Sequence, residues 1–218
     1  MVGMTFANRD EAAHLLAEKL SAYKGRNALI LAIPRGAVPM GKILANQLSG
    51  ELDVILVRKL GALGNPEYAI GSVDESGHVT LNPEAEGIVD DSYLEEEIQR
   101  QMDTMRKRRA LYTPVRPPID PKDRIVIIVD DGIATGSTML AALHAIRQKN
   151  PRKLIAAIGV APQESVERLA GVADEVVCLQ TPALFAAVGQ FFEEFPQVDD
   201  AEVVKTLTTR TLKKGSMQ

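Results

Sequence analysis

The segment of the sequence with the clearest chemistry covers residues 125–138 and reads IVIIVDDGIATGST. A run of β-branched apolar residues ends at two aspartates, Asp130 and Asp131, and a helical pattern begins at Met139. Between them lie small or hydroxyl-bearing residues whose backbone N–H groups can approach a phosphate closely: Ala134, Thr135, Gly136, Ser137 and Thr138. The amino end of the following helix adds its dipole to such a site. This order predicts a site for a phosphorylated sugar with free hydroxyl groups.

The same segment argues against two common nucleotide-binding loops. No lysine follows Gly136, so the segment is not a Walker A loop, and the glycine spacing does not fit a dinucleotide fingerprint. Asp130 and Asp131 would repel a phosphate, so we expect them to accept hydrogen bonds from sugar hydroxyls and to favour positive charge on a ribose ring. The simpler alternative is that Asp131 or Thr135 only caps the helix. A cap alone does not require two aspartates followed by TGST.

Strands and helices alternate along the chain, and they must position this segment. The apolar runs predict strands over residues 28–33, 52–57, 125–129, 154–160 and 175–179. Helical spacing predicts helices over 9–23, with Asn8 as N-cap, and over 38–48, 92–112, 139–147 and 164–169. This alternation predicts an α/β fold, in which a parallel twisted sheet carries helices on both faces.

Three chemically unusual segments follow predicted strands. They are Pro34–Ala37, the basic pair Arg58–Lys59 at the end of the strand over 52–57, and Asp130–Thr138. In parallel sheets, ligands bind beyond the carboxyl ends of strands where the strand order reverses. We therefore expect these three segments to meet at one site.

The region between the second and third strands reads as a loop, a hairpin and a long helix. Residues 60–67 are rich in glycine and contain Asn65–Pro66, which predicts a mobile loop. Residues 69–73 and 78–81 predict a hairpin. Ser92 and Glu95 predict a capping box for the long helix, whose basic cluster Arg106–Arg109 is read first as a solvated helix end.

Composition limits the possible partners. The 218 residues carry 25 basic and 29 acidic side chains, a net charge of −4, which gives no electrostatic reason to bind nucleic acid or an anionic membrane. Cys178 is the only cysteine and lies in an apolar run, so a core thiol is favoured over a nucleophile. Charged residues 9–11 precede any long apolar stretch, so we expect no signal peptide and a cytoplasmic protein.

The segment VIIVDDGIATGST resembles the ribose-phosphate motif of the type I phosphoribosyltransferases. The sequence does not identify the acceptor subgroup within that family. The resemblance implies one domain over residues 1–218, with a core at about 24–180. It also implies a flexible loop at about 60–81 that closes over the site. A small hood from about 1–23 and 181–210 would select the acceptor.

The resemblance also implies a role for each motif. Asp130 and Asp131 would hold the ribose hydroxyls of 5-phosphoribosyl-1-pyrophosphate (PRPP), and residues Ala134 to Thr138 would hold its 5′-phosphate. Arg35, Gly36 and Ala37 would bind pyrophosphate through backbone N–H groups, by way of a strained or cis peptide. Arg58 and Lys59 would neutralise the leaving group. Magnesium would be bound mainly through PRPP, without a dedicated protein site.

Two functions remain open from the sequence. The first is an enzyme that transfers the phosphoribosyl group to a nitrogen acceptor, most simply a nucleobase. The second is a regulator that senses PRPP without catalysis, and a phosphorylase-like or hydrolytic activity on nucleotides is a weaker third. Glu67 or Asp74 is a candidate general base, although a solvated loop acid is favoured for each. A homodimer is implied by the resemblance, with Arg106–Arg109 then facing a neighbouring site.

Overall fold

The structure is a computed structural model that describes residues 5–82, 85, 87 and 89–208. Within them, five strands form a parallel sheet in the order β2-β1-β6-β7-β8. These strands are β1 (Leu29–Ala32), β2 (Glu51–Val54), β6 (Ile125–Gly132), β7 (Lys153–Val160) and β8 (Glu175–Gln180). The predicted parallel sheet is confirmed, and the strand order reverses between β1 and β6.

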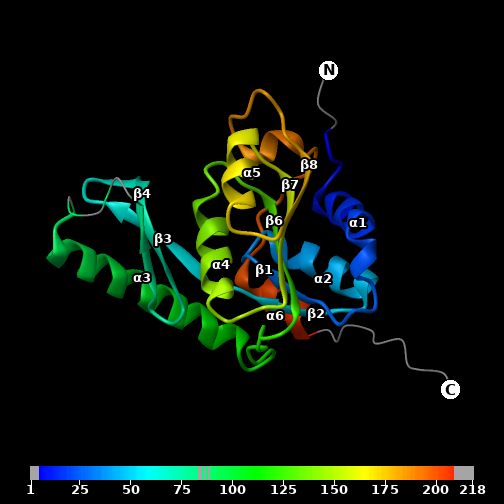
Figure 1. Ribbon diagram of the computed structural model, residues 1–218, viewed down its shortest axis with the longest axis horizontal. Coiled ribbons are helices and arrows are strands. Elements are labelled where there is room, and N and C mark those ends of the chain that lie inside the picture. Colours follow the sequence, from blue (N-terminus) through cyan, green and yellow to red (C-terminus); the bar gives the residue numbers. More distant parts are fainter. Residues whose placement is uncertain (1–4, 83–84, 86, 88, 209–218) are drawn as a thin grey trace.

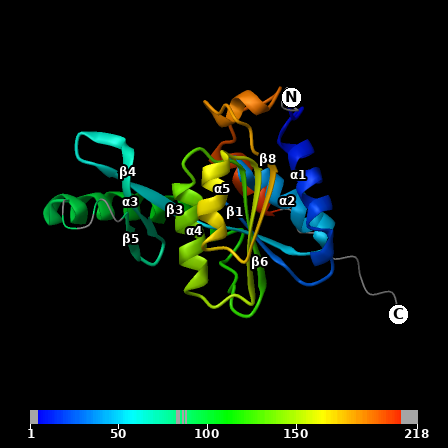
Figure 2. The same ribbon diagram turned by 45° about the horizontal axis from the view of Figure 1, so that its top comes forward.

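Helices cover both faces of this sheet (Figures 1 and 2). One face carries α1 (Arg9–Lys19), α2 (Ala37–Leu48) and α6 (Asp200–Thr208), and the other carries α4 (Ser137–Arg147) and α5 (Gln163–Ala170). Alternate residues of β1 face the two layers: Ile30 and Ala32 pack with α1 and α2, while Leu29 and Leu31 pack with α4. This alternation buries both faces, as the apolar strands predict.

A second, antiparallel sheet projects from the core together with the long helix α3 (Asp91–Tyr112) (Figure 1). Its strands are β3 (Val57–Ala62), β4 (Asn65–Asp74) and β5 (Val79–Leu81). The predicted hairpin over 69–73 and 78–81 is confirmed as β4 and β5. We call β3, β4 and β5 the flap sheet.

Two predictions about this region are wrong in secondary structure. The strand expected over 52–57 divides into β2, which ends at Val54, and β3, so Arg58 and Lys59 lie inside the flap sheet. Residues 60–67 are not one loop, because β3 continues to Ala62 and pairs with β4 from Asn65 onward. The movement expected of this segment stays a prediction.

Helix ends follow local capping chemistry. Asn8 accepts a hydrogen bond from the Glu11 N–H at 3.0 Å and begins α1, as expected, but α1 ends at Lys19 and a short 3₁₀ turn, η1 (Ser21–Tyr23), follows. The capping box expected at Ser92 is wrong, because Asp90 is the N-cap of α3 and accepts from the Tyr93 N–H at 3.0 Å.

The two segments expected to form a hood meet beyond the sheet. Phe6 forms a parallel bridge with Phe192, and its carbonyl accepts from the Glu193 N–H at 2.8 Å. The 3₁₀ turn η3 (Val188–Phe191) belongs to the second segment. Residues 1–4, 209 and 210, which the expected hood also included, lie outside the described residues.

Candidate active site

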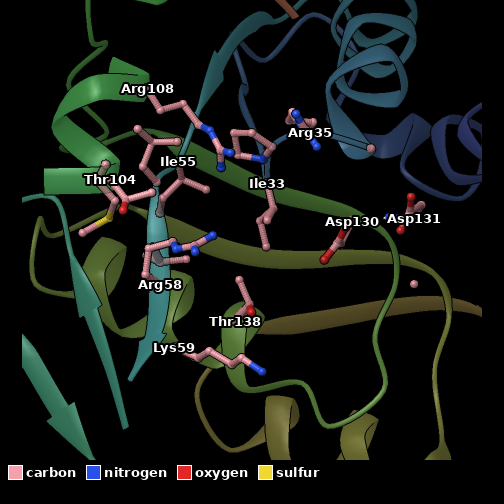
Figure 3. A pocket seen from close by; sticks show the side chains of 16 residues that line it. Ile33, Arg35, Ile55, Arg58, Lys59, Thr104, Arg108, Asp130, Asp131 and Thr138 are labelled. Atoms are coloured by element: carbon pink, nitrogen blue, oxygen red, sulfur yellow. Dashed lines mark hydrogen bonds between the residues drawn. The ribbon is translucent and has the colours of Figure 1, made fainter. Parts of the chain in front are cut away.

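A cavity of about 420 Å³ opens at the carboxyl ends of β1 and β6, where the strand order reverses. Parallel pairing of Ala32 with Val129 brings the residues after each strand together across this cavity. It is lined by Ile33–Gly36, Ile55–Lys59, Thr104, Met105, Arg108, Asp130–Gly132 and Thr138 (Figure 3). All three segments expected to meet therefore contribute to one cavity of a size that suits a small ligand.

Asp130 and Asp131 end β6 at the edge of the cavity. The Asp130 carboxylate points toward the cavity in Figure 3, and its Oδ1 accepts from the Asp131 N–H at 3.0 Å. Asp131 is buried, and its Oδ2 accepts from Arg9 Nε at 2.7 Å. Burial raises the pKa of both carboxyls; the neighbouring Asp131 raises the pKa of Asp130 further, and Arg9 opposes the shift at Asp131.

The loop Pro34–Ala37 lies beside these aspartates. The Pro34–Arg35 peptide bond is cis, in agreement with the expected strained or cis peptide. A Cβ at Gly36 would lie 2.5 Å from Asp131 Oδ2, so only glycine lets the loop come this close to the carboxylate. Arg35 and Gly36 line the cavity, whereas Ala37 is the buried first residue of α2 and is absent from the described lining.

The loop expected to bind the 5′-phosphate turns from β6 into α4. Gly136 adopts a positive φ of 74° immediately before α4 begins at Ser137. Thr138 lines the cavity, whereas Ala134 and Thr135 are exposed beside it. Helix α5 holds the loop from behind, because Ser165 Oγ donates to the Ala134 carbonyl, and Arg168 Nη2 donates to the Thr135 carbonyl, each at 2.7 Å.

Arg58 and Lys59 reach the cavity from β3 of the flap sheet, not from the parallel sheet. Arg58 Nε donates to Gln101 Oε1 of α3 at 2.9 Å, and Gln101 Nε2 in turn donates to buried Glu97 at 2.9 Å. Burial, and then the like charge of Arg108, lower the pKa of Arg58. The side chain is therefore held beside the cavity at an electrostatic cost that an anionic ligand would relieve.

The sequence interpretation missed Arg9 and Thr104 at this site, and it assigned Arg108 to a solvated helix end or to a neighbouring site. Arg9 of α1 reaches Asp131, and Thr104 and Arg108 of α3 line the cavity. Thr104 and Arg108 are one helical turn apart and share a face with buried Met105, a spacing that could have indicated a role for α3. Arg9 carries no such local signal, because its partner is 122 positions away.

Other residues with possible chemical roles make capping or packing contacts instead. Asp74 Oδ1 accepts from the Ser76 and His78 N–H groups at 2.8 and 3.0 Å, so it caps the turn between β4 and β5. The Phe192 ring packs against the rings of Phe6 and Phe195, with centroid distances of 5.2 and 4.9 Å. Cys178 is half-buried rather than fully buried, and burial raises the pKa of its thiol to about 11.

No grouping of three or more histidine, cysteine, aspartate or glutamate side chains suited to a metal occurs within residues 5–82, 85, 87 and 89–208. In that same part of the chain, none of the helices combines the length and the apolar character needed to cross a membrane.

Comparison with known proteins places this geometry in a family context. The sequence model of the phosphoribosyl transferase domain matches residues 6–191. Two Mycobacterium tuberculosis proteins, MT0597 (strain CDC 1551 / Oshkosh) and Rv0571c (strain ATCC 25618 / H37Rv), are named provisionally as phosphoribosyl transferases. Each is 41% identical over 204 residues, which are 93% of this chain and 46% of theirs. The chain thus spans about half the length of these curated relatives.

A solved structure is also similar over nearly its whole length. The crystal structure of TT1426 from Thermus thermophilus superimposes with a TM-score of 0.85 and 47% sequence identity. The match covers 94% of this chain and 98% of that chain. The overall fold described above is therefore shared with a solved relative.

Proposed function

The chain belongs to the phosphoribosyl transferase domain family, a class of pentosyltransferase enzymes, and we propose on this premise that it uses PRPP with magnesium to phosphoribosylate a nitrogen acceptor. One observation carries the proposal: a single cavity is lined by Gly36, Arg58, Lys59, Asp130 and Thr138. These side chains and backbone groups match the three parts of PRPP, which are a diphosphate, a ribose and a 5′-phosphate. The proposed domain covers residues 1–218 and acts as a homodimer.

The proposed donor spans the cavity from the flap sheet to α4. The loop of Ala134 to Thr138 and the amino end of α4 bind the 5′-phosphate, where Gly136 brings backbone N–H groups close. Asp130 and Asp131 accept hydrogen bonds from the ribose hydroxyls. Arg9 fixes the position of the Asp131 carboxylate by donating a hydrogen bond to it. Arg35 and Gly36 bind the diphosphate at the β1–α2 loop, whereas the part expected of Ala37 would require its buried backbone N–H to become accessible.

In the proposed reaction, the acceptor nitrogen forms a bond to C1 of the ribose as the C1–O bond to pyrophosphate breaks. Pyrophosphate leaves with the bonding electron pair, and the proton of the acceptor passes to solvent. Arg58 and Lys59 stabilise the negative charge that develops on the leaving group. The Asp130 carboxylate favours the positive charge that develops on the ribose ring. Binding both substrates in one cavity supplies orientation, which can lower such barriers by about 7–11 kcal/mol.

Magnesium fits the donor set of the cavity as a partner of the substrate phosphates. Asp130 and Asp131 are the oxygen-donor carboxylates in the lining, and Arg9 already pairs with Asp131. Mg²⁺ keeps several waters and commonly binds one or two carboxylates together with substrate phosphates. When bound there, it would offset the charge of the diphosphate.

Calorimetry with PRPP and Mg²⁺ tests donor binding, and an acceptor panel assayed for pyrophosphate release tests transfer. We expect PRPP binding at micromolar concentrations and pyrophosphate release with a nitrogen heterocycle. Exchange of both Asp130→Asn and Asp131→Asn should weaken PRPP binding at least tenfold. Asp103→Asn is the matched control, because Asp103 is exposed on α3 and pairs with Arg106. Failure to bind at millimolar PRPP would refute the proposal.

The second candidate is a PRPP sensor that binds the donor without transferring it. The paired cations Arg58 and Lys59 favour the enzyme, because they supply leaving-group stabilisation that binding alone does not require. Tight PRPP binding without pyrophosphate release from any acceptor in the panel would favour the sensor.

A further inference from the structure

Helix α3 forms one wall of the cavity, and we propose that its Arg108 binds the diphosphate group of the donor. This inference rests on the proposed function and adds a binding residue from an element outside the three motifs. Thr104 and Arg108 lie one turn apart and both line the cavity. Figure 3 shows the guanidinium groups of Arg108 and Arg58 pointing into the same space.

The position of Arg108 is fixed by the face of α3 that carries it. Tyr112 follows Arg108 by one turn, is fully buried, and donates from its hydroxyl to Asp200 Oδ1 at 2.5 Å. Met105 on the same helix is also buried. These contacts hold the helix against the core, so Arg108, whose side chain is 23% exposed, cannot turn freely into solvent.

Asp200 ties Arg108 to the loop that is proposed to bind pyrophosphate. Its carboxylate lies 3.5 Å from Arg108 Nε and 3.6 Å from Arg35 Nη1. One half-exposed carboxylate therefore faces two guanidinium groups that both line the cavity. Both ion-pair distances are too long for strong hydrogen bonds, so donor N–H groups are left to meet a ligand.

The charge balance around this wall favours an anion with several oxygens. Arg35, Arg58 and Arg108 approach the cavity from three different elements, namely the β1–α2 loop, β3 and α3. Like charges held together in a partly buried site repel unless an anion lies between them. Guanidinium groups bind phosphate oxygens through paired N–H donors, so a diphosphate could engage two or three of them at once.

Calorimetry on the full chain separates the proposed role from a structural one. Arg108→Gln is titrated with magnesium pyrophosphate, with PRPP and with ribose 5-phosphate, which lacks the diphosphate. We expect at least a tenfold loss of affinity for pyrophosphate and PRPP, with less than a twofold change for ribose 5-phosphate. Arg108→Lys keeps the charge without the paired donors and should recover part of the loss.

Arg106→Gln is the matched control on the same helix. Arg106 is 63% exposed and pairs with Asp103 at 2.9 Å, so its exchange should leave all three affinities unchanged. If Arg108→Gln does not fold, Arg108→Lys alone must still weaken the binding of pyrophosphate more than the binding of ribose 5-phosphate.

Unchanged pyrophosphate affinity in Arg108→Gln, or an equal loss for all three ligands, would overturn the inference while leaving the proposed function intact. A wild-type chain that binds neither PRPP nor pyrophosphate would overturn both.

Discussion

Arg9 Nε lies 2.7 Å from Asp131 Oδ2, which joins the first helix of the chain to the acidic pair at the end of β6. The guanidinium group of Arg9 also lies 3.7 Å from the centre of the Phe195 ring, and its Nη1 donates to the Pro196 carbonyl at 2.6 Å. One side chain thus connects both hood segments to the proposed ribose site. Because Arg9 and Asp131 are largely buried, each depends on the other for its charge balance.

Arg9→Gln should lower the free energy of unfolding by about 3 kcal/mol, because it leaves the Asp131 carboxylate buried without its cation. Urea unfolding measures this loss. Arg106→Gln, which breaks an exposed pair, should cost less than about 1 kcal/mol. Asp131→Asn should relieve part of the Arg9→Gln defect in the double variant. Strictly additive effects would show that the two side chains are not coupled.

Gly36→Ala should move the Asp131 carboxylate, because the new Cβ would lie 2.5 Å from Oδ2 and 3.1 Å from Arg9 Nη2. We expect a destabilisation of about 1–3 kcal/mol and at least a tenfold loss of PRPP affinity. Thermal unfolding and calorimetry measure the two effects. Gly171→Ala is the control, because the nearest atom to its Cβ is the Arg168 carbonyl oxygen at 3.4 Å. Unimpaired PRPP binding by Gly36→Ala would contradict the proposed site.

Asp130→Asn should stabilise the fold at neutral pH while it impairs donor binding. Burial raises the pKa of Asp130 in the folded state, so folding is favoured most below the unfolded pKa of about 3.9. This contribution is lost as the pH rises through the folded pKa. The asparagine side chain carries no charge at any pH, so this variant should be more stable than the wild type at pH 7, and the gain should vanish near pH 3.

Urea unfolding of both proteins between pH 3 and pH 8 measures the difference. Asp103→Asn, at an exposed position, should show no comparable gain at pH 7. A gain for Asp130→Asn that grew toward low pH would have the wrong sign and would refute the assignment.

Arg109 should hold the flap sheet to the core. Its Nη2 pairs with Glu75 Oε2 at 2.5 Å in the turn between β4 and β5, and its Nη1 lies 3.7 Å from buried Asp53 of β2. Arg109→Gln should cost about 3 kcal/mol, because Asp53 remains buried, whereas Glu75→Gln should cost about 1 kcal/mol.

Urea unfolding measures both costs, and hydrogen exchange should show faster opening of β4 and β5 in each variant. If Glu75→Gln cost as much as Arg109→Gln, the buried Asp53 would not be the reason for the larger loss.

Local chemistry in the sequence was enough to predict several features. The strand, acidic pair, small loop and helix over residues 125–138 follow one another along the chain, so their pattern and capping preferences are readable without tertiary contacts. The same holds for Asn8 as N-cap and for the hairpin of β4 and β5. Apolar alternation with helices also predicted the parallel sheet, and with it the meeting of three segments at its carboxyl edge.

Only the tertiary structure decided which strand carries Arg58 and Lys59. Residues 52–57 form one apolar run, but the chain leaves the parallel sheet after Val54 and enters the flap sheet at Val57. The hydrophobic effect favours burial of an apolar run but does not specify which strand it pairs with. The apolar run over residues 52–57 therefore does not reveal that the chain changes sheets within it. The prediction that the basic pair ends a strand of the parallel sheet is therefore wrong, although both residues line the expected cavity.

The tertiary structure also added the charged partners that no local pattern contains. Arg9 pairs with Asp131, and Arg108 and Arg35 both pair with Asp200. The partners in each pair are far apart in the sequence. Sequence periodicity records which side of an element is buried, but ion pairs depend on where separate elements come together. The motif of β6 and its loop was therefore determined by the sequence itself, whereas the charge balance around it was decided by the packing of α1, α3 and α6.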